Sequence, residues 1–168
     1  DAYRHLLVCS ALATRIALDL EVRSRKKYSL SALAPGHDIG KLVLPIEVLT
    51  KETPLNDEEK NWVKHHSLAG YLILLYYVGQ EDLDSCRVAY EHHERLDGSG
   101  YPRGIRQNDE TIQIMAVCDM FNALISPRPY RKDTYTIPKA IEILQQDASM
   151  GKLSLSVVSL LKSYCHYL

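Results

Sequence analysis

Two adjacent histidines open the stretch of this 168-residue chain that has the strongest chemical signature. From His92 to Gly104 the residues read HHERLDGSGYPRG. Histidine is the most common protein ligand for transition metals. The glycines and Pro102 favour a tight, stiff turn, which would hold Tyr101 on a rigid loop. The stretch therefore indicates a metal site beside an ordered loop; the alternative is a helix C-terminus with two surface histidines and an ordinary turn.

Four other places in the chain offer metal-ligating side chains. His37 and Asp38 are neighbours that pair a nitrogen ligand with an oxygen ligand, and an aspartate can bridge two ions through its two oxygens. Asp119 lies among Ile, Met, Val and Cys residues, where a carboxylate is costly unless it is paired or binds a metal. His5 and His66 share helical faces with apolar residues. The alternative for His5 is a hydrogen-bonded core histidine, and the alternative for Asp119 is a carboxylate that faces solvent.

Basic residues suited to an anionic substrate follow two of these places. Lys41 comes three residues after Asp38, one turn further along if the backbone there is helical. Residues 126–131, SPRPYR, form a basic loop stiffened by two prolines. The arginines of this loop, Arg128 and Arg131, suit bidentate contacts to phosphate and stacking on bases. The basic run at residues 23–27 is interpreted instead as a solvated loop or helix end.

Apolar residues at spacings of three and four predict helices that would position these side chains. One helix opens at Asn56, with Glu59 in a capping-box arrangement. On that helix we expect Trp62 and His66 to face inward and His65 to face solvent. The remaining helices cover, approximately, residues 3–20, 83–95, 112–125, 136–146 and 155–168. Because no alternating strand pattern of useful length occurs, the fold class is predicted to be all-α.

The composition excludes several classes of protein. With 20 Lys and Arg against 21 Asp and Glu, the net charge is close to zero, which argues against a nucleic acid polymer as partner. No apolar run is long enough for a membrane span. The four cysteines are scattered without a Cys-x-x-Cys pair, so we expect reduced thiols, no cysteine metal site and a cytoplasmic protein. Residues 1–168 are interpreted as one domain of a longer chain.

The ordered set of histidines and aspartates resembles the HD-GYP family of bacterial cyclic di-GMP phosphodiesterases, a branch of the HD phosphohydrolase superfamily. The matching motifs run in family order: HDIGK at 37–41, HSLAG at 66–70, the stretch from His92 to Gly104, Asp119, and RPYR at 128–131. The chain departs from the family pattern at Pro35-Gly36, at Asn122 in place of the usual aspartate, at Pro127 and at residues 153–155. None of these departures removes a proposed ligand.

The resemblance implies a compact helical bundle of the HD-domain type with a metal centre between helices. It implies two transition-metal ions, Fe or Mn, with Asp38 as the bridging ligand and Lys41 on the scissile phosphate. Tyr101, Arg128 and Arg131 would line the nucleotide site. The implied metal ligands are His5, His37, Asp38, His66, His92, His93 and Asp119.

The implied reaction is attack of an activated water on phosphorus of cyclic di-GMP, which gives linear pGpG and leaves further cleavage to GMP open. Asp1 precedes His5 by four residues and is a candidate ligand for a third metal; the alternative is a helix N-cap or a terminal residue without a ligand role. Two rival functions remain open. One is a catalytically weak cyclic di-GMP sensor, or an interaction module that binds a protein partner through the Gly-Tyr-Pro loop. The other is an HD phosphohydrolase for a different nucleotide.

Overall fold

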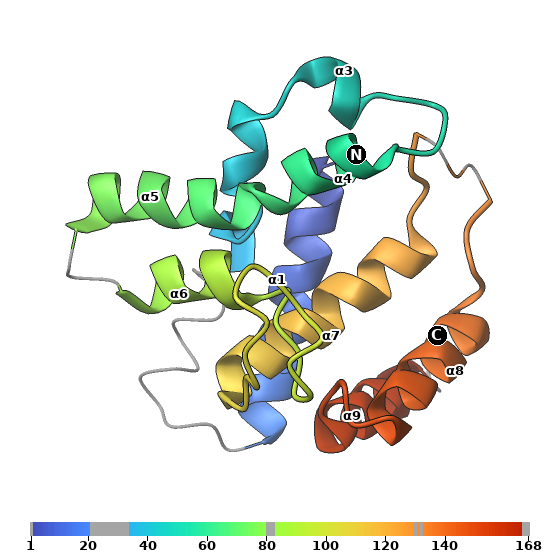
Figure 1. The fold of residues 1–168 in the computed structure, drawn as a ribbon. Coiled ribbons are helices and arrows are strands. Elements are labelled where there is room, and N and C mark those ends of the chain that lie inside the picture. The colour runs from blue at the N-terminus through green and yellow to red at the C-terminus, as the bar shows by residue number, and fades with distance from the viewer. Residues whose placement is uncertain (1, 21–33, 80–82, 130, 132, 166–168) are drawn as a thin grey trace.

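The computed structural model describes residues 2–20, 34–79, 83–129, 131 and 133–165, and this part of the chain is built from helices, with no strand (Figure 1). The predicted all-α fold class is thereby confirmed. The described helices are α1 (Ala2–Asp19), α3 (Ile46–Leu49), α4 (Asp57–Lys64), α5 (His66–Val78), α6 (Leu83–Glu91), α7 (Glu110–Ile125), α8 (Ile137–Ser149) and α9 (Leu155–Cys165). Two 3₁₀ turns, η1 (Ala34–Gly36) and η2 (Ile39–Val43), lie between α1 and α3. None of these helices is long and apolar enough to cross a membrane.

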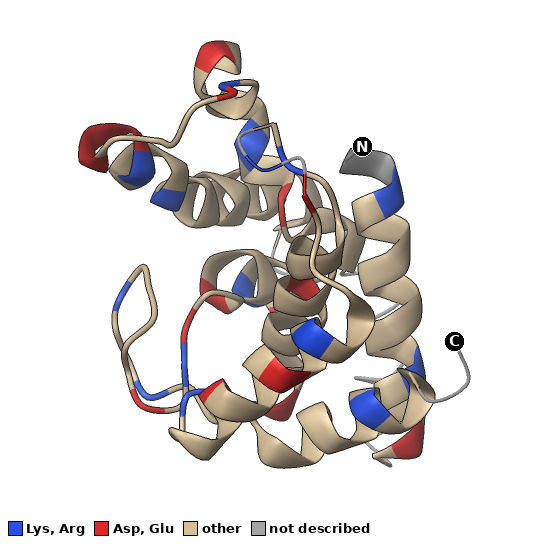
Figure 2. Ribbon diagram, turned by 90° about the vertical axis from the view of Figure 1, so that its right-hand side faces the viewer, with Lys and Arg blue, Asp and Glu red and all other residues tan. Residues whose placement is uncertain are grey.

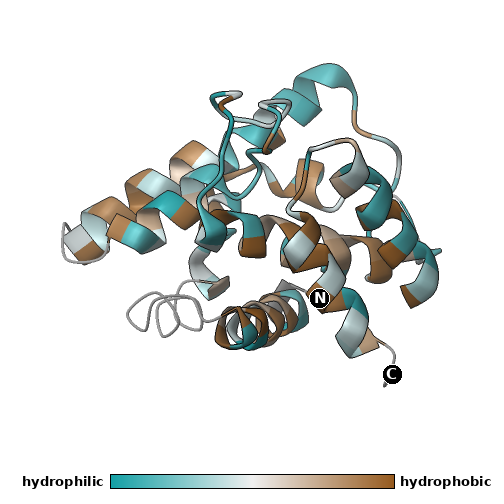
Figure 3. Ribbon diagram, turned by 90° about the horizontal axis from the view of Figure 1, so that it is seen from below, coloured by the Kyte–Doolittle hydropathy of each residue, from teal (hydrophilic) through white to brown (hydrophobic). Residues whose placement is uncertain are grey.

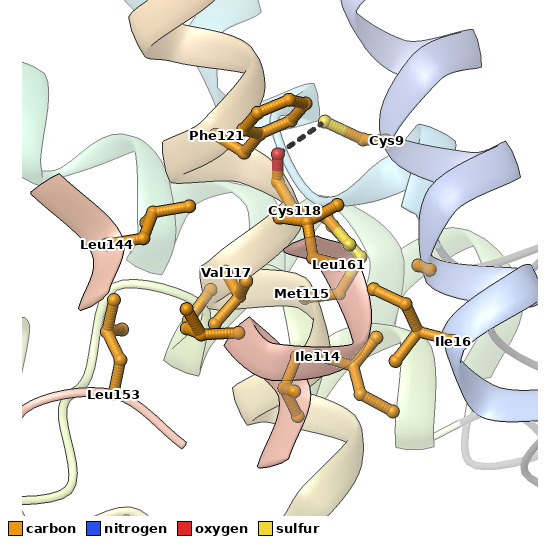
Figure 4. Packing of buried hydrophobic residues seen from close by; sticks show 14 of the residues in the cluster. Cys9, Ile16, Ile114, Met115, Val117, Cys118, Phe121, Leu144, Leu153 and Leu161 are labelled. Atoms are coloured by element: carbon orange, nitrogen blue, oxygen red, sulfur yellow. Dashed lines mark hydrogen bonds between the residues drawn. The ribbon is translucent and has the colours of Figure 1, made fainter. Parts of the chain in front are cut away.

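Helix α7 runs through the middle of the molecule and is buried on almost every side. Its residues from Thr111 to Asp119 are all buried, which explains why its sequence is apolar around the whole helix rather than along one face. Helices α1, α8 and α9 pack against it and supply most of the remaining core (Figure 4). Asp119 is therefore not a solvent-facing carboxylate, because only 9 % of its surface is exposed.

Charged residues of both signs are scattered over the helices and loops (Figure 2). The hydrophobic residues lie mainly along the helices, whereas the loops are mostly hydrophilic (Figure 3). The mixture of positive and negative residues agrees with the near-neutral net charge of the chain.

Helices α5 and α6 lie side by side as a hairpin, and η2 packs against α5 at a point of close backbone contact. A Cβ atom on Gly40 would lie 1.9 Å from the carbonyl oxygen of His66 and 2.5 Å from the backbone nitrogen of Gly70. Only glycine at position 40 allows this approach. The contact places the backbone of the HDIGK motif directly on the first turn of α5.

The helix predicted from Asn56 onward is two helices. The predicted capping box is present: Glu59 N donates to Asn56 Oδ1 and Asn56 N donates to Glu59 Oε2, both over 2.8 Å. At the end of α4 the chain tightens, so that His65 N donates to the carbonyl of Trp62, three residues back, over 3.0 Å. The prediction of an inward Trp62 is wrong, since that residue is 42 % exposed. His66 is buried and His65 is exposed, as predicted.

Two other predicted helices have different ends. Helix α6 ends at Glu91 rather than 95, so His92 and His93 lie in the turn that follows it. Helix α8 continues three residues further than predicted, to Ser149. The basic run at residues 23–27, Asp1 and residues 166–168 lie outside the described residues.

The contact at Gly40 generates the first prediction. Gly40→Ala should lower the free energy of unfolding by about 2–3 kcal/mol, because the added methyl group meets backbone atoms that cannot move aside without separating η2 from α5. The control is Gly36→Ala, where the nearest atoms to an added Cβ belong to the Leu74 side chain at 3.6 and 3.7 Å. Thermal and denaturant unfolding of both variants measures the difference; equal stability of the two would contradict the close contact.

Candidate metal centre and the adjoining cavity

The seven implied metal ligands that the structure describes meet at one place between the helices. They come from α1, the turn between η1 and η2, the first residue of α5, the turn after α6, and α7. Their donor atoms fall into overlapping groups in which the atoms lie within 4.8 Å of one another, close enough to hold a metal ion. The members are His5, His37, Asp38, His66, His92, His93 and Asp119.

Asp38 lies at the middle of the cluster, and its two oxygens face different histidines. Oδ2 is 3.6 Å from Nε2 of both His5 and His37. Oδ1 is 3.4 Å from His66 Nε2 and 4.0 Å from His92 Nε2. A carboxylate placed in this way can serve two cations at once, one through each oxygen.

Asp119 spans the cluster on the α7 side. Its Oδ1 is 3.2 Å from His5 Nε2 and 3.7 Å from His37 Nε2, and its Oδ2 is 4.0 Å from His93 Nδ1. Two donor groups result, one around His5 and His37 and the other around His66, His92 and His93. Asp38 borders both.

Backbone carbonyls fix the orientation of three of the imidazoles. His37 Nδ1 donates to the carbonyl of Ala34, and His66 Nδ1 donates to that of Val63 over 2.5 Å. His92 Nδ1 lies 3.0 Å from two carbonyls at the end of α6. Because Nδ1 carries the proton in each ring, the lone pair of Nε2 points into the cluster, as in the histidines of metal sites.

His37 Nε2 provides the sharpest test of whether this cluster fits a metal. The ring is completely buried, and Nε2 has no hydrogen-bond partner within the described part of the chain. An unsatisfied buried polar atom costs about 1–3 kcal/mol. A cation among the neighbouring donors would satisfy it, and mixed imidazole and carboxylate ligands suit Fe, Mn, Ni or Zn better than Mg. The residues present therefore fit a transition metal.

Burial and charge put most of the ligands in the protonation state that metals need. Burial lowers the pKa of His93 to about 3 and also lowers the pKa values of His66 and His92, which keeps these rings neutral. Burial alone would raise the pKa values of Asp38 and Asp119, but interactions with His37 and other cationic neighbours lower both, so the carboxylates stay ionised. The pKa of His37 is raised, because the two carboxylates outweigh its burial.

Asn122 and Cys9 surround the ring of His5, and neither was predicted as its partner. Asn122 Nδ2 lies 2.7 Å from His5 Nδ1 and donates to the carbonyl of His5 over 3.1 Å. Cys9 Sγ lies 4.0 Å from Nδ1 and 3.8 Å from Nε2 of the same ring, so it packs on the ring face rather than along a lone pair. Burial raises the pKa of the Cys9 thiol, in keeping with the expected reduced cysteines.

A cavity of about 800 Å³ opens beside the cluster. Its wall includes His5, Asp38 and Lys41 on the metal side and Arg128 on the side of the proline-containing loop. The ammonium group of Lys41 contacts Asp38 Oδ2. The volume lies in the range of pockets that hold small-molecule ligands.

Arg131, predicted to line the nucleotide site beside Arg128, lies elsewhere. Its guanidinium donates to the carbonyls of Ala123 over 2.6 Å and of Leu124 over 3.2 Å, and it stacks on the ring of Tyr135. It thus closes the C-terminal end of α7 instead of facing the cavity. Two backbone hydrogen bonds of 2.9 Å join Arg128 and Arg131 and hold the loop in place.

Tyr101 lies beside the His66 and His93 part of the cluster. Its ring stacks on His93 with the centroids 4.5 Å apart and 24° between the planes, and meets His66 edge-on. Burial and the charge of Asp119 raise the pKa of its phenol. Tyr101 therefore fixes the His93 ring, and it does not border the cavity described above.

Glu94 is a positioning residue that the sequence did not reveal. It is fully buried, and its carboxylate accepts hydrogen bonds from the backbone nitrogens of Arg103 at 2.7 Å and Ile105 at 3.1 Å. It therefore ties the Gly-Tyr-Pro loop to the turn that carries His92 and His93. A carboxylate directly after a histidine pair and before a glycine-rich turn was the signal available.

The second prediction concerns this carboxylate. Glu94→Gln should destabilise the protein by about 1–3 kcal/mol, because an amide has one acceptor oxygen and its NH₂ group would face a backbone N–H. Hydrogen exchange should show faster opening at residues 103 and 105. Glu110→Gln, at an exposed position on α7, serves as the control. Unchanged exchange at these two amides would argue that Glu94 does not hold the loop.

Comparison with known proteins reveals clear relatives. The HD domain family model matches residues 2–153. The 3'3'-cGAMP-specific phosphodiesterase 1 of Vibrio cholerae is 38 % identical over 152 residues, which cover 89 % of this chain and 34 % of the relative. The cyclic di-GMP phosphodiesterase of Thermotoga maritima is 35 % identical over 150 residues, 84 % of this chain and 38 % of the relative. The chain thus spans little more than a third of the length of these curated relatives.

Among solved structures, Bd1817, an HDG"Y"P protein from Bdellovibrio bacteriovorus, has a similar fold. The TM-score is 0.77 at 19 % sequence identity, and the match covers 99 % of this chain and 53 % of the other. At this identity the likeness concerns the fold alone.

Proposed function

Because this chain belongs to the HD domain family, and its motifs match the HD-GYP branch, we propose that it is the catalytic domain of a metal-dependent cyclic di-GMP phosphodiesterase. The observation that carries the proposal is the position of Asp38. Its two oxygens face two groups of imidazoles at the edge of a cavity that Lys41 and Arg128 also line. Two of the relatives described above carry names that assign them cyclic dinucleotides as substrates.

The donor set supports two metal positions. His5, His37 and Asp119 would hold one ion, His66, His92 and His93 the other, and Asp38 would contribute an oxygen to each. We propose Fe or Mn, since these metals accept mixed nitrogen and oxygen ligands and the family resemblance implies them. When bound, such ions activate the attacking water and stabilise charge on the phosphoryl oxygens.

The residues of the chain itself perform the remaining tasks. The Lys41 ammonium is held beside Asp38 and would neutralise negative charge that develops on the scissile phosphate. Arg128, on its fixed loop, would bind phosphate or guanine. The Tyr101 ring stacks on His93 and would keep that ligand in place. The free cysteines fit the reducing cytoplasm, where we expect the protein to act.

The third prediction tests the reaction. Protein loaded with Mn²⁺ or Fe²⁺ under anaerobic conditions should convert cyclic di-GMP to pGpG, as followed by chromatography. Asp38→Ala should abolish turnover and release metal, because it removes the oxygens shared by both donor groups. Asp57→Ala, which alters an exposed carboxylate paired with Lys60 on α4, should retain both activity and metal. Tight binding of cyclic di-GMP without any product would favour a sensor, and hydrolysis of other nucleotides alone would favour a different phosphohydrolase.

The fourth prediction concerns the number of metals. Asp1 lies outside the described residues, so its candidate role as a ligand for a third ion stays a hypothesis. An aspartate is short for that role, and we expect about two metal ions per chain. Elemental analysis of the protein and of Asp1→Ala, both extended upstream of residue 1, measures the ratio. A ratio near three that falls to two in the variant would establish Asp1 as a ligand.

A further inference from the structure

His5 differs from three other imidazoles of the cluster in the group that lies at its Nδ1 atom. In His37, His66 and His92 a backbone carbonyl lies at Nδ1, so this atom carries the proton and Nε2 has a lone pair for an ion. At His5 the side-chain amide nitrogen of Asn122 lies 2.7 Å from Nδ1 instead. Because an amide nitrogen can only donate, this contact is a hydrogen bond only if Nδ1 of His5 carries a lone pair.

Two contacts fix which end of the Asn122 amide faces His5. Nδ2 donates to the backbone carbonyl of His5 over 3.1 Å, and Oδ1 accepts from the Ser126 hydroxyl over 3.0 Å. If the amide were turned over, Oδ1 would face the carbonyl oxygen of His5, and two acceptors would meet without a proton between them. Asn122 and His5 are both buried, so such a mismatch would be costly. The donor end of the amide therefore stays at Nδ1.

This arrangement determines where a neutral His5 ring carries its proton. With a lone pair on Nδ1, the proton is on Nε2, which lies 3.2 Å from Asp119 Oδ1 and 3.6 Å from Asp38 Oδ2. To bind an ion, a neutral ring must free Nε2 and carry the proton on Nδ1, where it would point at the amide N–H of Asn122. Ligation through His5 thus requires the amide to rotate and to lose its hydrogen bond to the His5 carbonyl.

We propose that Asn122 is a positioning residue that makes the ion beside His5 the more weakly bound of the two. This inference rests on the two metal positions described under the proposed function. At the other position, His66 and His92 already have carbonyls at Nδ1, so their rings need no rearrangement before they bind an ion. The two ions would then bind in separate steps, and the ion beside His5 would exchange more readily.

The first test locates the proton in the metal-free protein. The ¹⁵N chemical shifts of the His5 ring, at about pH 8 where an ordinary imidazole is neutral, should show a proton on Nε2 and none on Nδ1. The His5 signals are those absent from the spectrum of His5→Gln. In Asn122→Asp the proton should move to Nδ1, because a carboxylate only accepts hydrogen bonds. A wild-type His5 that carries its proton on Nδ1 would overturn the proposal without recourse to any Asn122 variant.

The second test is a titration with Mn²⁺, in which electron paramagnetic resonance measures the free ion and so resolves the two binding steps. Asn122→Asp should tighten the weaker step about 10-fold, a usual effect of a partner that orients a metal-ligating histidine. The tighter step should stay within about two-fold of wild type. Asn122→Ala removes the donor without adding a charge and should tighten the weaker step by a smaller factor. Asn61→Asp, at an exposed position on α4, is the matched control and should change neither step.

Three results of the titration would overturn the proposal. Weaker Mn²⁺ binding in both Asn122 variants would show that this residue only supports the fold. Tightening in Asn122→Asp alone, with an unchanged His5 tautomer, would assign the effect to the added charge. Loss of the tighter step in His5→Gln would place the stronger site at His5. Neither test uses cyclic di-GMP, so protein that binds Mn²⁺ as expected but leaves this dinucleotide intact would contradict the proposed function and not this inference.

Discussion

The whole arrangement depends on the burial of two ionised carboxylates, Asp38 and Asp119, among imidazoles, three of which burial keeps neutral. Each carboxylate is costly in the interior unless opposite charge compensates it. The lowered pKa values of His66, His92 and His93 mean that these rings cannot provide that charge by taking up protons. His37, whose pKa is raised, and Lys41, which contacts Asp38, compensate part of the negative charge, and cations held by the cluster would compensate more of it. A cluster that combines two negative groups with several uncharged donors favours the binding of metal ions.

The fold holds most of the proposed metal ligands in position by placing them where helices begin or end. His66 starts α5, and the pair at 92–93 follows the last residue of α6, so both groups lie close to backbone carbonyls that orient the rings. Gly40 brings the Asp38 turn onto α5 at backbone distance. Only His5 and Asp119 come from within long helices, and α7 is rigid there because it is buried on nearly all sides.

The sequence predicted those features of the fold and of the candidate site that depend on residue type and local spacing. The all-α class and the capping box at Asn56 follow from patterns of three and four residues, and the inward His66 follows from the same periodicity. Asp119 stood out because its neighbours are apolar. The break at His65 escaped detection because a single tightened turn hardly changes the spacing of apolar residues.

Local sequence patterns did not predict which groups several of the polar side chains contact. Nothing near Arg131 reveals that its guanidinium turns back to the end of α7, and nothing near Arg4 reveals that it lines the same cavity as Arg128. The same holds for Asn122 on α7, which contacts His5 across 117 residues of the chain. Such side chains have ordinary surroundings in the sequence, and only the folded chain shows which groups they contact.

The distribution of the ligands along the chain has a mechanical consequence. Residues from position 5 to position 119 would share the same ions, so bound metal would act as a removable cross-link among α1, α5, α7 and the turns between them. A ligand that binds only the folded chain stabilises it in proportion to the logarithm of its free concentration. Metal supply would then set the lifetime of the domain as well as its activity, and a cell that depletes the metal would expose the domain to unfolding and proteolysis.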